Sequence, residues 1–118
     1  MEYNTVCHVE FDATDLVSAQ KFYEGLFGWT FCPFGDEMLV FQSGERHLGG
    51  ITKVDKVSNG SSPSVWFNVE DLDASLAKVE ELGGNIHTAK SMLPDVGWTA
   101  CALDLDGNEV GLVEFVKA

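Results

Sequence analysis

Two side chains near the start of the chain have the types and spacing to bind a divalent metal. His8 and Glu10 lie two residues apart in the run VCHVEF, whose alternation predicts a strand, so both side chains should share one face. Imidazole and carboxylate groups both coordinate divalent cations, but a transition-metal site normally needs three or four protein ligands. His8 and Glu10 are therefore candidate ligands of an incomplete set. The other interpretation of His8 is a cavity-lining or hydrogen-bonded histidine of the sheet.

The other reactive side chains form no recognisable constellation. Cys7, Cys32 and Cys101 lie far apart and include no CxxC pair, which indicates reduced thiols rather than disulfides or a zinc knuckle. His47 and His87 fall in or near predicted turns, offer no ligand spacing and are expected to be solvated. The sequence contains no nucleophilic triad and no phosphate-binding loop.

A repeat in the sequence predicts the elements that position these residues. The stretch 11–28, FDATDLVSAQKFYEGLFG, returns 56 positions later as 67–84, FNVEDLDASLAKVEELGG. Each copy passes from an apolar alternating run into an acidic residue followed by Leu, and then into a helical pattern closed by Gly. The repeated unit is therefore predicted to be a strand followed by a helix.

The rest of each half predicts three further strands. In the first half we expect strands at 6–11, 29–34, 38–43 and about 48–53, with a helix capped at 12–15 that carries the apolar stripe Leu16, Ala19, Phe22, Tyr23 and Leu26. In the second half we expect strands at 64–69, 85–92, 98–103 and 109–116, with a helix at 71–82 that buries Leu72, Leu76, Val79 and Leu82. The polar run 54–62, VDKVSNGSS, reads as the linker between a first module at about 5–53 and a second at about 63–117.

Length and charge narrow the class of protein. The chain has 118 residues, 45% of them hydrophobic, which suits one domain with a real core. The formal net charge of −12 repels phosphates, so neither nucleic acid nor a membrane surface is an expected partner. No stretch approaches the roughly 18 apolar residues of a membrane span, and the start lacks a basic segment leading into an apolar run. We therefore expect a cytoplasmic protein.

Several stretches together resemble the vicinal oxygen chelate superfamily, which includes glyoxalase I, bleomycin resistance proteins and extradiol dioxygenases. They are FYEGLFGW at 22–29, VEDLDASLAKVEELGG at 69–84 and GWTACALDLDGNEVGL at 97–112, together with the repeat itself. The resemblance implies an α+β fold in which two βαβββ modules form curved mixed sheets that enclose a cavity. It leaves the function open, because this fold hosts lyases, isomerases, dioxygenases and binding proteins.

The resemblance also implies where a metal would be held. Family enzymes chelate substrate oxygens on a divalent metal that acts as a Lewis acid. His8 stands seven residues before Asp15, as the first-strand histidine of glyoxalase-like members does, but the pseudo-equivalent position in the second half is Ser64. The family's two carboxylates fall at Gly111 and at about Gly49 or Gly50. We therefore expect that the usual metal centre is lost, with His8, Glu10 and Glu114 as the remaining candidates for a displaced site.

Polar and aromatic side chains remain on the strands that would line the cavity. Ser64, Trp66 and Asn68 share a face, and we expect them to form a ligand-binding surface together with His8 and Trp98. The other interpretation of Trp66 and Trp98 is that both are ordinary core residues. A wall of aromatic rings with a few polar groups suits a small, partly apolar organic ligand.

Three functions stay open at this point. The first is a small-molecule binding protein of the glyoxalase and bleomycin resistance type, with no cofactor. The second is a metal-dependent lyase, similar to lactoylglutathione lyase, or a dioxygenase that uses His8 with Glu10 or Glu114. The third is a non-catalytic interaction module. For each we expect a homodimer, because sheet edges and an apolar helix flank would otherwise stay exposed.

Overall fold

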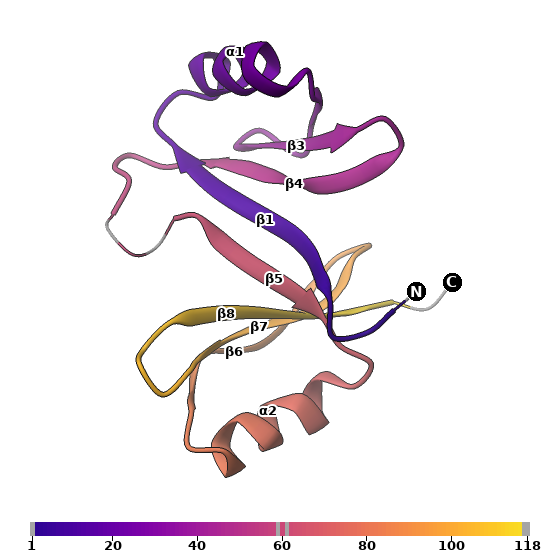
Figure 1. The fold of residues 1–118 in the computed structure, drawn as a ribbon, viewed down its shortest axis with the longest axis vertical. Coiled ribbons are helices and arrows are strands. Elements are labelled where there is room, and N and C mark those ends of the chain that lie inside the picture. The colour runs from indigo at the N-terminus through magenta and orange to yellow at the C-terminus, as the bar shows by residue number, and fades with distance from the viewer. Residues whose placement is uncertain (1, 59, 61, 117–118) are drawn as a thin grey trace. The chain divides into compact units, whose positions relative to one another are not determined.

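The computed structural model describes residues 2–58, 60 and 62–116, and it contains two βαβββ modules (Figure 1). The first module consists of β1 (Val6–Ala13), α1 (Leu16–Phe27), β2 (Thr30–Pro33), β3 (Met38–Ser43) and β4 (Arg46–Lys53). The second consists of β5 (Ser64–Asn68), α2 (Leu72–Glu81), β6 (Asn85–Leu93), β7 (Gly97–Leu103) and β8 (Glu109–Phe115). Every element predicted from the sequence is present, within a few residues of its expected bounds.

Each module builds its own four-stranded mixed sheet. In the compact unit Cys7–Ser64 the strand order is β2-β3-β4-β1, with β1 and β4 parallel and the other pairs antiparallel. In the other unit, residues 2–6 and 65–116, the order is β5-β8-β7-β6, with β5 and β8 parallel. The prediction of an α+β fold with two βαβββ modules is confirmed.

The internal repeat is visible in the caps of the two helices. The Asp15 side chain accepts hydrogen bonds from the N–H groups of Val17 and Ser18 at 2.9 and 3.2 Å. The Asp71 side chain, 56 residues later, accepts one from Ala74 at 3.1 Å. Both aspartates satisfy N–H groups that the first helical turn leaves without partners. The repeated Asp-Leu pair therefore marks the start of a helix in each module.

The core of the Cys7–Ser64 unit is aromatic. Phe41 is buried and stacks on Trp29 with ring centroids 4.6 Å apart. Phe11 from β1 stacks on Tyr23 from α1 at 5.0 Å. These contacts attach α1 to one face of the sheet, so the opposite face is the one that carries His8 and Glu10.

The core of the other unit is mainly aliphatic. Leu72 of α2 is fully buried and clusters with Val69, Ala100 and Leu112. Side chains packed around this cluster are Phe67, Leu76, Val79, Trp98 and Val110. The helix α2 therefore covers one face of its sheet, as α1 does in the first module.

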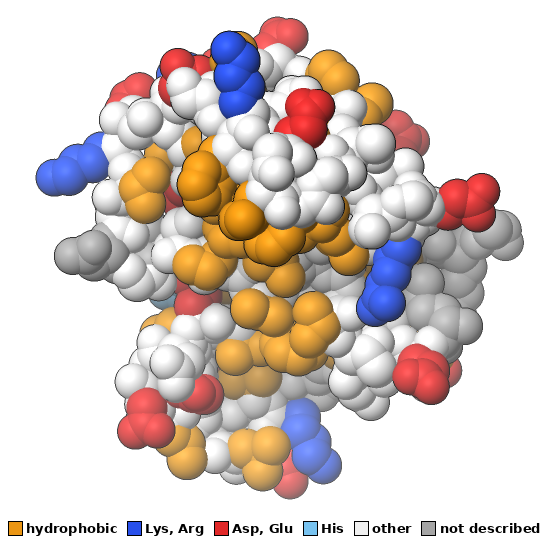
Figure 2. All heavy atoms as spheres, turned by 45° about the horizontal axis from the view of Figure 1, so that its top comes forward, with side chains coloured by type: hydrophobic (Ala, Val, Ile, Leu, Met, Phe, Trp, Pro, Cys, Tyr) orange, Lys and Arg blue, Asp and Glu red, His pale blue; other side chains and the backbone are white. Residues whose placement is uncertain are grey.

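The two helices bury less than their apolar patterns predict. Phe22 and Leu26 of α1 are 63% and 59% exposed, and Leu82, just after α2, is 65% exposed. The prediction that Leu82 belongs to a buried stripe is therefore wrong, because the stripe of α2 is buried at its start, at Leu72, and exposed just past its end. Figure 2 shows apolar side chains at the surface among scattered acidic ones.

The N-terminal residues join the second module. Asn4 donates its N–H to the carbonyl of Asn68 at 2.7 Å, and Asn68 donates to the carbonyl of Thr5 at 3.1 Å. The sequence pattern began the first module at about residue 5 and did not reveal this pairing. No helix within the described residues is long and apolar enough to cross a membrane.

Candidate functional site

His8 lies between Glu10 and His47 in a line of three polar side chains on one face of the first sheet. Its Nε2 is 3.2 Å from Oε1 of Glu10, and its Nδ1 is 2.8 Å from Nε2 of His47. The two imidazole planes are 18° apart, with centroids separated by 5.1 Å. The centroid separation is longer than the distance between Nδ1 of His8 and Nε2 of His47 by about two ring radii. The two rings therefore meet edge to edge, as an N–H···N hydrogen bond requires.

The exposure of the three side chains changes along the line. The His8 and Glu10 side chains are 21% and 24% exposed, and His47 is more exposed than either. Partial burial and the charge of the neighbouring His8 lower the pKa of His47. The line thus begins at a partly buried carboxylate and ends at an imidazole that solvent reaches.

A β-bulge brings His47 to this face. Phe41 pairs with Gly49 but Gln42 pairs with His47, so β4 has one extra residue, Leu48. Strict alternation would have placed His47 on the face of Gly49, which looks toward the aromatic core. The prediction of a solvated turn residue missed the contact with His8 for this reason. Little in the sequence indicated this bulge, because Leu48 is a residue type that is common in regular strands.

Gly50 lies directly beside Glu10 in the parallel pair of β1 and β4. A Cβ at Gly50 would be 3.5 Å from Oε1 of Glu10 and 2.8 Å from Cε of Met38. At Gly49 a Cβ would overlap the carbonyl oxygen of Val9. Gly50, and not Gly49, therefore shares the face of His8. The Glu10 carboxylate lies close to where a side chain at residue 50 would be.

Trp66 occupies the corresponding place in the second module. Residue 66 follows residue 10 by the 56 positions of the repeat, and Trp66 pairs with Gly111 as Glu10 pairs with Gly50. A Cβ at Gly111 would stand 2.7 Å from Cε2 of the indole and closer still to Cδ2. The half-buried indole therefore covers Gly111, and a carboxylate side chain at residue 111 would need that space.

Trp98 does not share the face of Trp66. Gly111 pairs with Cys101, whereas Trp98 lies three residues earlier on β7 and so has the opposite orientation. It packs against the core cluster beneath α2, with Nζ of Lys90 4.6 Å from the ring centroid. The structure thus contradicts the expectation that Trp98 lines one surface with Trp66. Trp98 is instead a core residue, which was the alternative interpretation of its role.

Asn68 and Ser64 differ in what they can offer a ligand. Asn68 is 2% exposed, its Oδ1 accepts from the N–H and Oγ1 of Thr5, and its Nδ2 donates to the carbonyl of Glu2 at 2.7 Å. Its side chain therefore ties the N-terminal segment to β5. Ser64 begins β5 and is half-buried.

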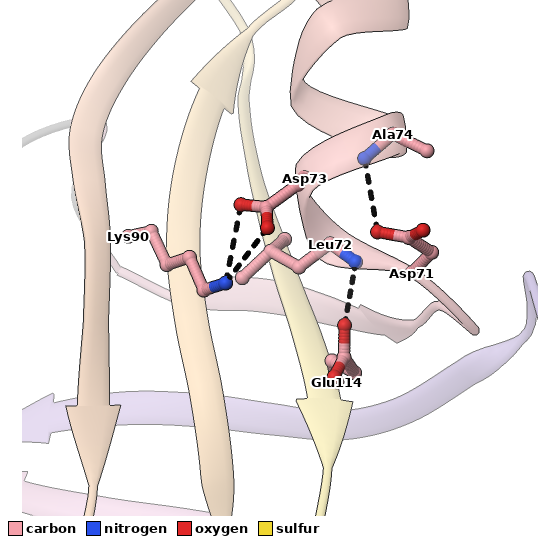
Figure 3. A network of polar contacts seen from close by, with 6 residues as sticks. All are labelled: Asp71, Leu72, Asp73, Ala74, Lys90 and Glu114. Carbon is pink, nitrogen blue, oxygen red and sulfur yellow. Dashed lines mark hydrogen bonds and ion pairs between the residues drawn. The ribbon is translucent and has the colours of Figure 1, made fainter.

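Glu114 faces α2. Its Oε1 accepts the N–H of Leu72 at 2.8 Å, and Asp73 nearby holds Lys90 through both carboxylate oxygens (Figure 3). Glu114 shares this face with Leu112 and not with Gly111, because side chains alternate along β8. Its carboxylate supports the start of a helix, which removes it from the candidate metal ligands.

The positions that the resemblance assigns to a metal do not fit one. Both ring nitrogens of His8 face other side chains, Gly111 is covered by an indole and Gly50 has no donor atom. Within residues 2–58, 60 and 62–116, no three His, Cys, Asp or Glu side chains converge in a way that could hold a metal ion.

Comparison with known proteins identifies relatives of the whole fold. The sequence profile of the Glyoxalase/Bleomycin resistance protein/Dioxygenase superfamily matches residues 5–112. A protein of Mycobacterium tuberculosis (strain CDC 1551 / Oshkosh), named "Putative glyoxylase CFP32", is 30% identical over 100 residues, which are 81% of this chain and 38% of that protein. The chain therefore spans well under half the length of this relative.

Solved structures share the fold at low sequence identity. A hypothetical protein from Bacillus halodurans C-125 superposes with a TM-score of 0.78 at 12% identity, covering 99% of this chain and 98% of that one. A superfamily member from Vibrio splendidus 12B01 gives 0.71 at 15% identity, covering 93% and 99%. These likenesses bear on the architecture alone.

Proposed function

Because the chain belongs to the glyoxalase/bleomycin resistance protein/dioxygenase superfamily, we propose that it binds a small, partly apolar organic molecule against the indole of Trp66. The observation that carries this proposal is the position of that ring over Gly111, where family enzymes have a carboxylate. An indole offers a large apolar face, which suits a flat or apolar ligand. No side chain on Gly111 competes for the space.

The proposal includes no metal centre. An indole cannot replace a carboxylate ligand, and His8 already interacts through both ring nitrogens. The binding surface therefore relies on apolar contact and hydrogen bonds. Asn68 and Trp98 are assigned to structural roles. The contribution expected from His8 and Ser64, which belong to the Cys7–Ser64 unit, stays a prediction.

The relative named as a glyoxylase suggests the class of compound to test. The word glyoxylase in the name of that protein suggests a glyoxal-type compound as a probe, so methylglyoxal is chosen, and phenol and benzyl alcohol test the aromatic preference. Ligand-observed NMR should detect binding of at least one of the three.

Variants at two tryptophans locate the binding surface. Trp66→Ala should weaken the affinity by about 1–3 kcal/mol, the range for loss of a desolvated aromatic anchor. Trp98→Ala is the matched control, since it removes an indole of the same unit from the opposite face, and it should lower stability without this loss of affinity. If none of the probes binds, or if both variants bind as the parent does, the proposal fails and the interaction-module alternative gains support.

A further inference from the structure

We propose that Glu10, His8 and His47 form a proton relay in which Nδ1 of His47 acts as a general base toward a bound organic molecule. The inference concerns the Cys7–Ser64 unit and does not depend on binding at Trp66. It rests on the two consecutive contacts of His8, at 3.2 Å to Glu10 and 2.8 Å to His47.

The two contacts determine where the protons lie. An ionised Glu10 only accepts hydrogen bonds, so Nε2 of His8 donates to it. A neutral imidazole has one donor and one acceptor, which makes Nδ1 of His8 the acceptor and Nε2 of His47 the donor. The remaining nitrogen, Nδ1 of His47, then carries a lone pair at the exposed end of the line.

This arrangement lets the positive charge of a proton taken up at that end form on His8. As Nδ1 of His47 accepts a proton from the substrate, its Nε2 proton can pass to Nδ1 of His8. His8 then becomes an imidazolium whose Nε2–H still faces the Glu10 carboxylate, so the new positive charge forms beside a negative one. Reversal of both transfers returns the proton to the substrate or to water.

The surroundings leave His47 available for this role. The bulge at Leu48 directs the ring to the face of His8 and Glu10, and the side chain is exposed. Gln42, which pairs with His47 across the sheet, donates its side-chain amide to the carbonyl of Gly44 at 3.0 Å. The side-chain amide of Gln42 is therefore engaged elsewhere, and Glu10 contacts His8 at the inner end of the relay.

A suitable probe needs a base and nothing else. In 5-nitrobenzisoxazole, removal of the C3 proton by Nδ1 of His47 leaves its electron pair to form the nitrile, while the N–O bond breaks and its pair stays on the phenolate oxygen. The product is a coloured cyanonitrophenolate, and the reaction needs no metal, oxidant or second reactant. Its rate therefore reports the strength and accessibility of the base.

The experiment compares the parent protein with three variants at matched concentration. His47→Gln should lower the rate on the order of 100-fold, the lower end of what a positioned general base contributes. His87→Gln removes an exposed histidine of β6 and should leave the rate unchanged. Glu10→Gln keeps the shape of Glu10 without its charge, so it should lower the rate.

Two results would overturn the relay. One is a parent rate no higher than that of free imidazole at the same concentration and pH. The other is equal loss in His47→Gln and His87→Gln, which would mean that any surface imidazole does the same. The tautomer gives a separate check, because ¹⁵N NMR of the parent should show the proton of His47 on Nε2, and a proton on Nδ1 would exclude the mechanism.

Discussion

The indole of Trp66 and the backbone of Gly111 are matched neighbours on adjacent parallel strands, and the ring takes the space that a side chain on Gly111 would need. The same pair of positions in the first module holds Glu10 and Gly50. In both modules, therefore, the first strand supplies the larger side chain of the pair and the last strand supplies a glycine. This exchange distinguishes the chain from the metal-binding pattern that the resemblance implied.

Gly111→Ala should destabilise the protein through this contact. The added methyl group would collide with the indole, and overpacking of this kind costs about 1–3 kcal/mol in the free energy of unfolding. Gly25→Ala is the matched control, because Gly25 lies inside α1 with nothing within 4 Å of a Cβ, and it should stabilise by about 0.5–1 kcal/mol. Urea unfolding measures both, and a Gly111→Ala protein as stable as the parent would contradict the packing.

Stability should fall in mild acid because of His47. Its pKa is lowered by partial burial first and by the charge of His8 second, so the unfolded chain binds more protons than the folded one just below the ordinary histidine pKa of about 6.5. The free energy of unfolding should therefore decrease as the pH drops from about 6.5 through the lowered pKa. His47→Gln should flatten this slope and His87→Gln should keep it. Equal slopes in all three proteins would argue against a lowered pKa of His47.

Removal of metal should leave stability unchanged. A metal bound only by the native state would add RT ln(1 + [L]/Kd) to the free energy of unfolding, and the described side chains offer no set of three ligands for one. We expect no stoichiometric Zn, Ni, Fe or Mn in freshly purified protein and the same Tm with and without chelator. A drop of several degrees with chelator would support the metal-dependent lyase or dioxygenase alternative.

The chain should form a homodimer through the exposed apolar side of α1. Phe22, Leu26 and Phe27 are 63%, 59% and 54% exposed, which is unfavourable for a helix that faces only water. Light scattering at micromolar concentration should give twice the mass of one chain. Leu26→Glu should give the mass of a single chain, whereas Lys21→Glu, an exposed change on the same helix, should not. A parent protein with the mass of one chain would refute the prediction.

Much of the architecture could be predicted from the sequence because it depends on local patterns. The repeat placed Asp15 and Asp71 at the starts of two helices, and the structure shows both as N-caps. Strand alternation also placed His8 with Glu10 on one face, where the two side chains are in contact. These properties follow from the order of neighbouring residues and from the two periods of helix and strand.

The site was less predictable because it depends on register and on contacts between distant residues. The bulge at Leu48 turned His47 toward His8 across 39 positions of sequence. The pairing of β7 with β8 determined that Trp98 faces α2. The side chain of Asn68 forms hydrogen bonds with the N-terminal segment, which the sequence pattern did not indicate. The enclosed cavity that the resemblance implied stays a prediction.

The indole N–H signals of the protein test the central claim most directly. In a ¹⁵N spectrum the signal of Trp66, assigned through Trp66→Phe, should shift in a saturable way as benzyl alcohol, phenol or methylglyoxal is added, while the signal of Trp98 should stay in place. Saturable shifts at Trp98 with none at Trp66, or no shift at either ring with any of the three compounds, would contradict a ligand surface built on Trp66.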